Sequence, residues 1–408
     1  MIPASPPTGP LPAYPDTFYR RSLARETPYA PLGGDRDADV CVIGGGLAGL
    51  SVALDLARAG KSVVLLEARR IAWGASGRNG GFVTPGYSTG IENIERRVDR
   101  DSATALYRMS MEGMEIVRDR VAAFGVAGAD VSAGLIAVTR YDSGDAMKKY
   151  AAAENARFGR ALVFLDRAAV QEKLLSPRYH QGICDPAAFH FHPLNYAQAL
   201  AAEIVAAGGI VAEGTPALAA RHQGGWQIVT HATGRVAAEH VVFAGGGLTD
   251  DVAPALRRAY LPIATYVLLT EKLGALEAAS IRTRAAIADD RRAGDYYRLV
   301  SDDAGDTRLL WGGRITTRTR DPDDIAAILR RQMVGTYPQL ADLRVELAWS
   351  GLMSYARHMM PQIGCLRGSP SAGAQWYLTG FGGHGMNTTA IGGRVIAEGI
   401  LRTSDRYR

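Results

Sequence analysis

Three glycines and one acid between residues 40 and 67 carry the chain's clearest chemical pattern. The segment reads VCVIGGGLAGLSVALDLARAGKSVVLLE, with glycines at Gly44, Gly46 and Gly49 and an acid at Glu67. A tight turn at Gly44 and bare backbone at Gly46 let a pyrophosphate approach, and Gly49 lets a helix pack closely on a strand. A carboxylate at the position of Glu67 can accept the hydroxyls of a ribose. These residues predict a site for a dinucleotide.

The elements that must position these residues can be predicted from the same segment. Residues 40–43 form an apolar run that suits a strand buried on both faces, and residues 63–66 form a second one. An alanine- and leucine-rich helix between them ends at Gly60, and its N-terminus faces the phosphates. The acid at Glu67 argues against a 2′-phosphate, so the pattern favours FAD or NAD over NADP.

Two further glycine-rich segments distinguish between FAD and NAD. Residues 74–81 read GASGRNGG, and residues 380–389 read GFGGHGMNTT. Such bare backbone suits close approach to a flat or anionic ligand. Together with the first motif, these segments resemble the D-amino-acid-oxidase type of FAD-dependent oxidoreductase, closest to its γ-glutamylputrescine oxidase branch, with glycine, sarcosine and pipecolate oxidases as relatives. The resemblance runs from about Asp37 to Leu401 and implies FAD.

The resemblance also implies which residues contact the cofactor. Besides Gly44, Gly46, Gly49 and Glu67, they are Leu47, Ala48, Ala68, Arg69, Gly74, Ala75, Ser76, Arg78, Asn79, Gly80, Gly81, Val211, Gly245, Gly246, Gly382, Gly383, His384, Gly385, Met386, Asn387 and Thr388.

A helix is predicted to begin at Asn387 or Thr388, at the end of the glycine-rich segment 380–389, because both residues are good N-caps. It runs to about Leu401. A helix N-terminus is a fixed positive pole, and the resemblance places it at the flavin pyrimidine, where a reduced flavin gains negative charge. His384 would then lie close to the ring. A structural histidine bonded to backbone is an equally open interpretation.

The resemblance implies oxidation of a C–N bond in an amine or amino acid by hydride transfer to flavin. The imine product hydrolyses, and O2 is reduced to H2O2. An apolar aromatic pocket would favour the neutral amine by desolvation. Candidate aromatic residues are Tyr266, Tyr296, Tyr297, Trp311 and Phe381.

Three residues are further candidates for catalysis or substrate selection. On strand alternation, Tyr296 and Arg298 share one face and Tyr297 the other. Arg298 could grip a substrate carboxylate, or it could form a surface ion pair. His358 stands where relatives often carry Asp or Asn, and it could select substrates or only hold a loop.

The chain lacks two residues that some members of this family use for oxygen activation and for covalent flavin attachment. Sarcosine-type oxidases carry an oxygen-activating lysine on a strand that here reads RLLWGG (308–313), and a flavin-binding cysteine in a block that here reads WSGLMSYARHMMP (349–361). Neither residue is present, so the flavin should be non-covalent. A dehydrogenase that uses another electron carrier, and a non-catalytic flavoprotein subunit, remain as alternatives.

The fold class expected is α/β: a discontinuous Rossmann-type FAD-binding domain and a mixed-sheet, α+β substrate domain. The FAD domain is assigned residues 37–90, 195–260 and 346–408, because nucleotide-fold signals recur in these blocks. The substrate domain is assigned residues 91–194 and 261–345. Residues 1–36 are a proline-rich N-terminal arm.

Composition fits a two-domain cytoplasmic enzyme. The chain has 408 residues, 47% hydrophobic and 21% charged, with a net charge of +5. No apolar run reaches the roughly 18 residues of a membrane span. The start has no secretory h-region, and no nucleic-acid motif is present. Cys41, Cys184 and Cys365 lack metal spacing and indicate reduced thiols, so we expect no metal. A basic cluster at 314–320 is a solvated face or a site for an acidic partner.

Overall fold

The first glycine-rich segment folds as its pattern predicts. β1 (Arg36–Ile43) leads through the glycine turn into α2 (Leu47–Arg58), and β2 (Val63–Leu66) returns parallel to β1. Ile43 lies opposite Leu66, and Val40 opposite Val63. The computed structural model describes residues 11–249, 251–291, 293–301, 304–367 and 373–408. Within them, no helix is long and apolar enough to span a lipid bilayer.

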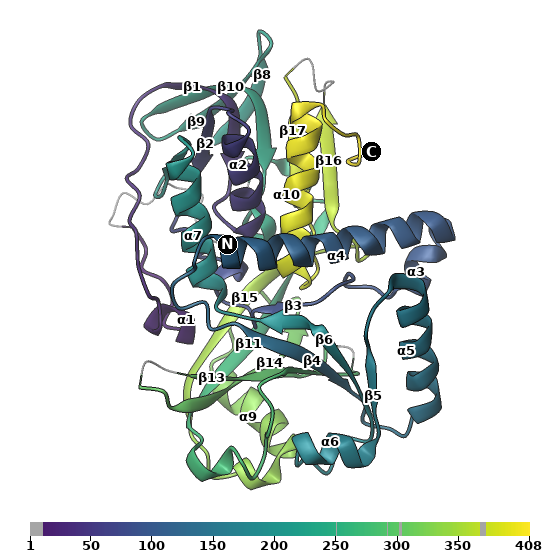
Figure 1. Cartoon of the computed structure of the whole chain (residues 1–408). Helices are drawn as coiled ribbons and strands as arrows, with labels where there is room; N and C mark the ends of the chain where they lie inside the picture. The colour runs from purple at the N-terminus through teal and green to yellow at the C-terminus, as the bar shows by residue number, and fades with distance from the viewer. Residues whose placement is uncertain (1–10, 250, 292, 302–303, 368–372) are drawn as a thin grey trace.

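This unit lies at the centre of the first sheet (Figure 1). The strand order is β16-β17-β10-β1-β2-β7, and β8 pairs with β9, which pairs with β10. Neighbours from β7 to β17 are parallel, whereas β16, β9 and β8 are antiparallel to their partners. The further strands are β7 (Ile210–Ala212), β8 (Ala219–Gln223), β9 (Trp226–His231), β10 (Gly234–Phe243), β16 (Gln362–Arg367) and β17 (Gln375–Thr379).

The helices α2, α7 (Pro193–Ala206) and α10 (Gly385–Leu401) lie side by side on one face of this sheet (Figure 1). Their apolar side chains share one buried cluster with β1 and β2. Parallel strands with packed helices are the architecture predicted for a Rossmann-type domain.

The second sheet contains both parallel and antiparallel neighbours. Its order is β15-β11-β14-β13-β12-β4-β6-β3, with β5 paired to β6. Only β12 and β4 run parallel; the other pairs are antiparallel. The strands are β3 (Phe82–Val83), β4 (Ser132–Val138), β5 (Val163–Leu165), β6 (Gly182–His190), β11 (Tyr260–Lys272), β12 (Ala286–Asp289), β13 (Tyr296–Ser301), β14 (Thr307–Thr316) and β15 (Val345–Ala356). The mixed second sheet is therefore as predicted.

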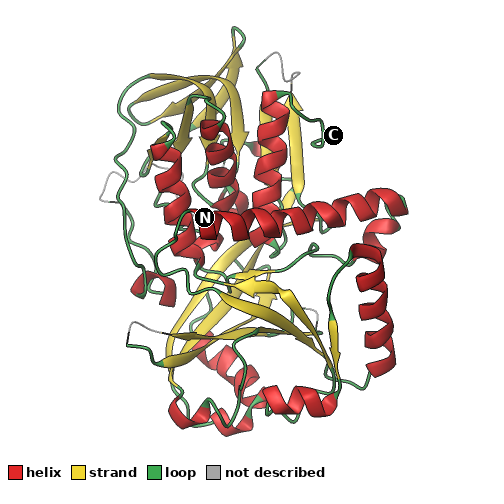
Figure 2. Cartoon of the chain, viewed as in Figure 1, coloured by secondary structure: helices red, strands yellow, loops and turns green. Residues whose placement is uncertain are grey.

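A long helix, α4 (Arg100–Ala123), crosses between the two halves of the molecule (Figure 2). It packs closely on α10 at Gly113, where a Cβ would lie 2.4 Å from the carbonyl oxygen of Asn387. The shorter helices are α1 (Phe18–Arg21), α3 (Ile91–Glu95), α5 (Gly144–Phe158), α6 (Arg167–Lys173), α8 (Pro254–Arg257) and α9 (Ile325–Thr336). The α9 helix packs on the second sheet, on the side away from α4 (Figure 1).

Sheet membership differs from the expected domain boundaries at two places. β15 and β3 belong to the second sheet, although residues 346–356 and 82–83 were assigned to the FAD domain. The residue pattern of each strand fits a buried strand of either sheet. The pairing of β15 with β11, and of β3 with β6, places both in the second sheet. The division of the chain into domains otherwise stays a prediction. In the described part of the N-terminal arm, the side chains of Tyr14 and Tyr19 are buried in the core.

Candidate active site

A cavity of about 730 Å³ lies between the two sheets. One wall is formed where β1, β2 and β10 end, at Gly44, Glu67 and Ala244. The opposite wall is the face of the second sheet that carries Tyr296. Open α/β sheets bind ligands at the carboxyl ends of their strands, and this volume suits a cofactor with a small substrate.

Two positions between β1 and the first turn of α2 admit only glycine: Gly44 in the connecting turn and Gly49 in the helix. Gly44 has φ +113°, and a Cβ there would lie 2.7 Å from the carbonyl oxygen of Ala244. A Cβ on Gly49 would lie 2.0 Å from the carbonyl oxygen of Gly44. At Gly46, by contrast, a Cβ would meet only the side chain of Ser76, with its Oγ at 3.0 Å. The bare backbone at Gly46 therefore leaves space in the cavity, whereas Gly49 serves packing.

Glu67 holds the turn in place at the end of β2. Its Oε2 accepts the N–H of Gly45 at 2.7 Å, and its Oε1 accepts the N–H of Arg69 at 2.8 Å. Burial raises the pKa of this carboxyl, and the two N–H donors oppose that shift. Each oxygen keeps a further lone pair, so the carboxylate can still accept a ribose hydroxyl.

Arg78 supplies a buried donor without a partner. Its guanidinium lies over the Trp73 ring at 4.2 Å, and Nε donates to the Trp73 carbonyl at 2.7 Å. Nη2 is buried, and none of the described residues accepts a hydrogen bond from it. Burial lowers the pKa of Arg78 to about 10. An orphaned cationic donor in a cavity wall indicates that a ligand supplies the acceptor.

The helix α10 begins within the third glycine-rich segment, residues 380–389. It starts at Gly385 with His384 as N-cap, two residues before the predicted start, because Asn387 and Thr388 bond elsewhere. Asn387 Nδ2 donates to the Ser110 carbonyl at 3.0 Å, and Thr388 Oγ1 donates to the His384 carbonyl. No side chain caps the first turn, and its residues Gly385, Met386 and Asn387 line the cavity, so this helix start is a positive pole at the cavity wall.

His384 lines the cavity and is anchored to backbone. Its Nε2 donates to the Thr84 carbonyl at 3.1 Å, because a carbonyl can only accept. Burial lowers its pKa, so the ring is neutral near pH 7. This agrees with the structural interpretation and also leaves the ring at the cavity wall.

Most of the predicted cofactor residues line this one cavity. They are Gly44, Gly46, Leu47, Ala48, Glu67, Ala68, Arg69, Gly74, Ala75, Ser76, Arg78, Asn79, Gly80, Gly245, Gly246, Gly382, Gly383, His384, Gly385, Met386 and Asn387.

Four predicted cofactor residues lie outside the cavity wall. Gly49 and Thr388 serve the packing and bonding described above. A Cβ on Gly81 would lie 2.1 Å from the Phe191 carbonyl oxygen, so this glycine serves the approach of β3 to β6. Val211 is buried in the core on β7, opposite Leu65 of the neighbouring strand β2.

Tyr296 occupies a slot between two glycines. A Cβ on Gly80 would lie 2.9 Å from its ring, and a Cβ on Gly312 would lie 2.0 Å from it. Tyr355 and Phe381 line the same cavity. These three aromatic residues give the cavity an apolar region next to the cofactor segment at Gly80.

The other candidate aromatic residues serve the core. Tyr297 and Trp311 stack at 4.2 Å on the opposite face of the second sheet, as alternation predicted for Tyr297. Tyr266 is buried in the same cluster.

Arg298, a candidate for gripping a substrate carboxylate or for a surface ion pair, is buried in a hydrogen-bond network instead. Its side chain is 1% exposed and lies outside the cavity wall. Nη1 bonds to Nδ1 of His190 at 2.9 Å, and Nη2 donates to the Phe191 carbonyl at 3.1 Å and to the Tyr19 hydroxyl at 3.3 Å. Burial and this guanidinium lower the pKa of His190 to about 3. Arg298 faces the same side as Tyr296, but the N-terminal arm and β6 cover it.

His358 is likewise not part of the cavity wall. It lies in the turn between β15 and β16, where Nδ1 accepts the Met360 N–H at 3.2 Å and its carbonyl accepts from Arg97 at 3.3 Å. These contacts agree with the alternative in which His358 holds a loop.

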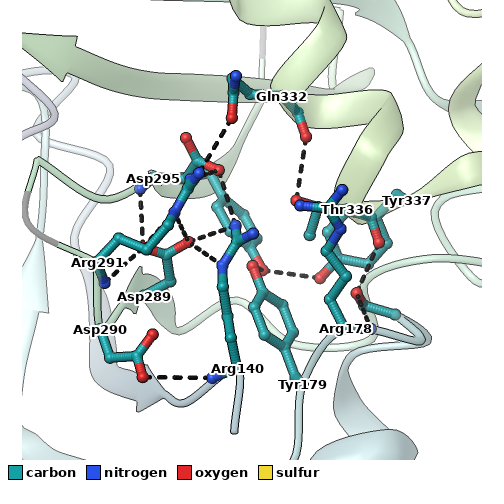
Figure 3. Close-up of polar contacts among 12 residues, drawn as sticks. Arg140, Arg178, Tyr179, Asp289, Asp290, Arg291, Asp295, Gln332, Thr336 and Tyr337 are labelled. Carbon is teal, nitrogen blue, oxygen red and sulfur yellow. Dashed lines mark hydrogen bonds and ion pairs between the residues drawn. The ribbon is translucent and has the colours of Figure 1, made fainter.

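A buried ion network holds the connection between β12 and β13 (Figure 3). Arg140 Nη2 lies 2.5 Å from Asp289 and 3.1 Å from Asp295, and Arg291 pairs with both carboxylates. Both carboxylates are almost fully buried. Gly294, in this connection, lines the cavity, so the network fixes part of the cavity wall.

Several cavity residues were not anticipated from the sequence. Tyr150, Arg160 and Asp185 lie at one end of the cavity, and Tyr355 and Arg314 at its sides. Two of them lie in segments that the sequence had singled out: Arg314 in the basic cluster at 314–320, and Tyr355 in the block without the flavin-binding cysteine.

The residues present fit FAD. Bare backbone at Gly46 and Gly382, an acid at Glu67, an orphaned donor at Arg78 and an uncapped helix start at Gly385 lie along one cavity. Together they offer groups for a ribose, a pyrophosphate and an electron-rich ring system. The fold and the site define an FAD-binding oxidoreductase.

Comparison with known proteins agrees with this class. Residues 39–399 match the family described as FAD dependent oxidoreductase (DAO), and the chain belongs to this family, with FAD as its cofactor. It is 35% identical over 394 residues to a protein named gamma-glutamylputrescine oxidoreductase from Escherichia coli, covering 96% of this chain and 90% of that protein. It is 31% identical over 400 residues to the probable oxidoreductase OrdL of Haemophilus influenzae, covering 96% and 89%.

Solved structures share the fold at low identity. Glycine oxidase from Geobacillus kaustophilus superposes with a TM-score of 0.74 at 16% identity, covering 91% of this chain and 97% of that one. The L-proline dehydrogenase from P. horikoshii gives a TM-score of 0.74 at 17% identity, covering 92% and 96%.

Proposed function

We propose that this protein oxidises the C–N bond of an amine or amino acid, giving an imine that hydrolyses, and reduces O2 to H2O2. Bound FAD supplies the chemistry by accepting a hydride from the substrate carbon. The observation that carries the proposal is the arrangement of an uncapped helix start at Gly385 and the aromatic residues Tyr296, Tyr355 and Phe381 around one cavity. The name of the Escherichia coli relative supports an amine as substrate.

The aromatic wall has a defined task in this reaction. A free alkylammonium has a pKa of about 10.4, taking lysine as the model, and it has no lone pair to assist loss of a hydride. Removal from water lowers the pKa of the amine, because burial disfavours the charged form. Tyr296, held by Gly80 and Gly312, keeps that region dry and fixes the substrate against the cofactor.

The helix start at Gly385 has the second task. Its unbonded N–H groups offer a positive pole that stabilises negative charge on a reduced ring without a buried counter-ion. The neutral imidazole of His384, anchored on Thr84, holds the start of this helix against the loop after β3.

A dehydrogenase that passes electrons to a carrier is the second candidate. It is favoured by the absence of a lysine from the strand of residues 308–313 and from the cavity wall formed by the described residues. A flavoprotein without catalytic activity, serving as a binding subunit, is the third.

A panel of amines and amino acids, mixed with the FAD-loaded protein without oxygen, tests the proposal. Bleaching of the flavin absorbance by an amine is expected, followed by rapid recovery and stoichiometric peroxide when air is admitted. Bleaching with slow recovery would establish the dehydrogenase. A flavin that no amine bleaches would contradict both activities.

A further inference from the structure

The N-terminal arm packs against a segment of the cofactor cavity wall. Residues 11–35 precede β1 and run along one edge of the molecule (Figure 1). They lie outside residues 39–399, the part of the chain that matches the family. Tyr14 of this arm is 9% exposed and belongs to the same buried cluster as Ile71 and Ala72. The arm is therefore part of the folded unit that surrounds the cavity.

Hydrogen bonds from the arm reach the residues on both sides of Ala72. The Tyr14 hydroxyl donates to the Ile71 carbonyl at 2.8 Å. Nε1 of Trp73 donates to the carbonyl of Ala13 at 3.1 Å. Two neighbouring residues of the arm thus hold two residues of the cavity segment, and only Ala72 lies between the two points of attachment.

Two residues of the FAD domain fix the position of this contact. Gln198, on α7, donates from Nε2 to the Tyr14 hydroxyl at 3.0 Å. Glu213, after β7, accepts the Ile71 N–H at 2.7 Å and the Tyr29 N–H at 3.4 Å. The Tyr14 hydroxyl therefore has both an acceptor and a donor, and one carboxylate bonds to the arm and to the cavity segment together.

Ala72 has a backbone conformation that needs such support. Its φ is +57°, in the left-handed region that residues other than glycine rarely adopt. The residue is 1% exposed, lines the cavity, and donates its N–H to the carbonyl of Gly45, in the first glycine turn, at 2.8 Å. A strained conformation persists where the surrounding contacts enforce it. The bonds to Ile71 and Trp73 are contacts of this kind.

The conformation of Ala72 sets the position of Trp73 and of the buried donor on Arg78. The Trp73 ring lines the cavity, with the guanidinium groups of Arg69 and Arg78 at 4.4 Å and 4.2 Å from its centre. The Trp73 carbonyl also accepts from Nε of Arg78 at 2.7 Å. A change of backbone at residue 72 would therefore displace groups that face the cofactor.

We propose that Tyr14 is a positioning residue for FAD, because its bond to Ile71 keeps Ala72 in the left-handed conformation that shapes the cavity wall. Docking of the N-terminal arm and binding of FAD then stabilise each other. By linkage, the docked arm strengthens FAD binding by the same factor by which bound FAD favours the docked arm. This inference concerns the cofactor and does not depend on the proposed oxidation of an amine.

The variant Tyr14→Phe tests the contact, since it removes the hydroxyl and keeps the ring. The measurement is the dissociation constant of FAD, from free FAD in ultrafiltrates of the serially diluted holoenzyme. We expect an increase of about 5- to 50-fold, because the buried Ile71 carbonyl loses its donor. Tyr29→Phe is the matched control in the same arm and should change the constant less than about 2-fold, since the buried Tyr29 hydroxyl has no hydrogen-bond partner among the described residues.

The variant Ala72→Gly tests whether backbone strain links the arm to the cofactor. Glycine adopts a positive φ without steric cost, so a segment with this change needs less support from the arm. In the Ala72→Gly background, Tyr14→Phe should raise the dissociation constant less than about 3-fold. The thermal midpoint gives a second measure: Tyr14→Phe should reduce the increase that FAD produces, whereas a residue that only stabilises the fold would lower the midpoint equally with and without FAD.

Limited digestion of the wild-type protein with trypsin tests the reciprocal effect. Arg25 is exposed in the arm and offers a cleavage site. Saturating FAD should slow cleavage after Arg25 about 5- to 50-fold relative to the FAD-free protein, because cleavage follows the population of the undocked arm. With FAD present, Tyr14→Phe should be cleaved faster than Tyr29→Phe.

Three outcomes overturn the proposal. The first is an FAD dissociation constant that Tyr14→Phe leaves unchanged. The second is an effect of Tyr14→Phe that is equally large with alanine and with glycine at position 72. The third is cleavage after Arg25 at the same rate with and without FAD, a result that needs only the wild-type protein and so holds even where a variant does not fold.

Discussion

Gly312 leaves the space in which the Tyr296 ring lies, so Gly312→Ala tests how the cavity wall is built. The two residues are opposite each other on β14 and β13. A Cβ on residue 312 would lie 2.0 Å from Cζ and 2.4 Å from the hydroxyl oxygen of Tyr296. Since ordinary contact begins at 3.4 Å, the ring must retreat by about 1.4 Å. Gly80 is also close to this ring, since a Cβ there would lie 2.9 Å from it.

The displaced ring should affect stability and activity but not FAD content. Overpacking costs about 1–3 kcal/mol, which lowers the thermal midpoint of a chain of this length by about 1–4 °C. If Tyr296 positions the substrate, a shift of this size should lower kcat/KM about 100-fold. Thermal unfolding followed by flavin fluorescence gives the first value, and anaerobic reduction with a reactive amine gives the second.

A double-mutant cycle with Tyr296→Ala isolates the steric cause. Once the ring is removed, Gly312→Ala should cost less than about 0.5 kcal/mol, so the coupling energy should nearly equal the cost of the single change. Gly351→Ala is the control, because its Cβ would meet only Cβ of Arg78 at 4.0 Å. An equally large cost of Gly312→Ala with and without the tyrosine ring would refute the reasoning.

Three further predictions concern the cofactor, the pH dependence and the ion network. Acid precipitation should release FAD into the supernatant, and Gly46→Val should abolish FAD loading while the fold is retained; colour in the pellet would disprove non-covalent binding. His190 binds its proton less readily when folded, with a pKa of about 3 against about 6.5 unfolded, so its contribution to stability is complete above about pH 6.5 and declines as the pH falls toward 3. His190→Gln should therefore flatten the fall of the thermal midpoint between pH 7 and pH 4, and an unchanged profile would contradict this. Arg140→Ala should cost about 3–5 kcal/mol, because the two buried carboxylates of Asp289 and Asp295 would share one remaining cation, Arg291, whereas loss of the 82% exposed Arg344 in Arg344→Ala should cost less than about 1 kcal/mol by the same thermal measurement.

Much of the FAD domain could be predicted, because the residues that specify its glycine turn and flanking strands are close together in the sequence. The glycine spacing, the apolar runs and the acid at Glu67 lie within one short segment, and the structure brings them to one turn. Helix starts were less accurate. α10 begins at Gly385 rather than at Asn387 or Thr388, with His384 as its cap. α7 likewise begins after a histidine, since His192 accepts the Asn195 N–H and acts as the cap. A histidine cap is not among the usual signals.

The substrate half was harder to predict because residue type does not reveal burial. Arg298 reads from the sequence as a ligand-binding cation, yet residues far away in the chain surround it. Arg160 and Asp185, by contrast, lie in segments without a recognisable motif. They become neighbours through the pairing of β6 with β4 and β5. No periodic pattern encodes which strands from distant segments will pair.

The sequence by itself determined the nucleotide-binding unit, the FAD-dependent family and the two kinds of sheet. These depend on steric requirements of glycine turns and on hydrophobic periodicity, which act over a few residues. Only the tertiary structure decided the shape of the cavity. The slot for Tyr296 needs Gly80 and Gly312 from segments far apart in the sequence, and the charged part of the cavity wall needs Arg160 beside Asp185. Such contacts arise when packing closes long loops, and their chemistry exists only once the chain has folded.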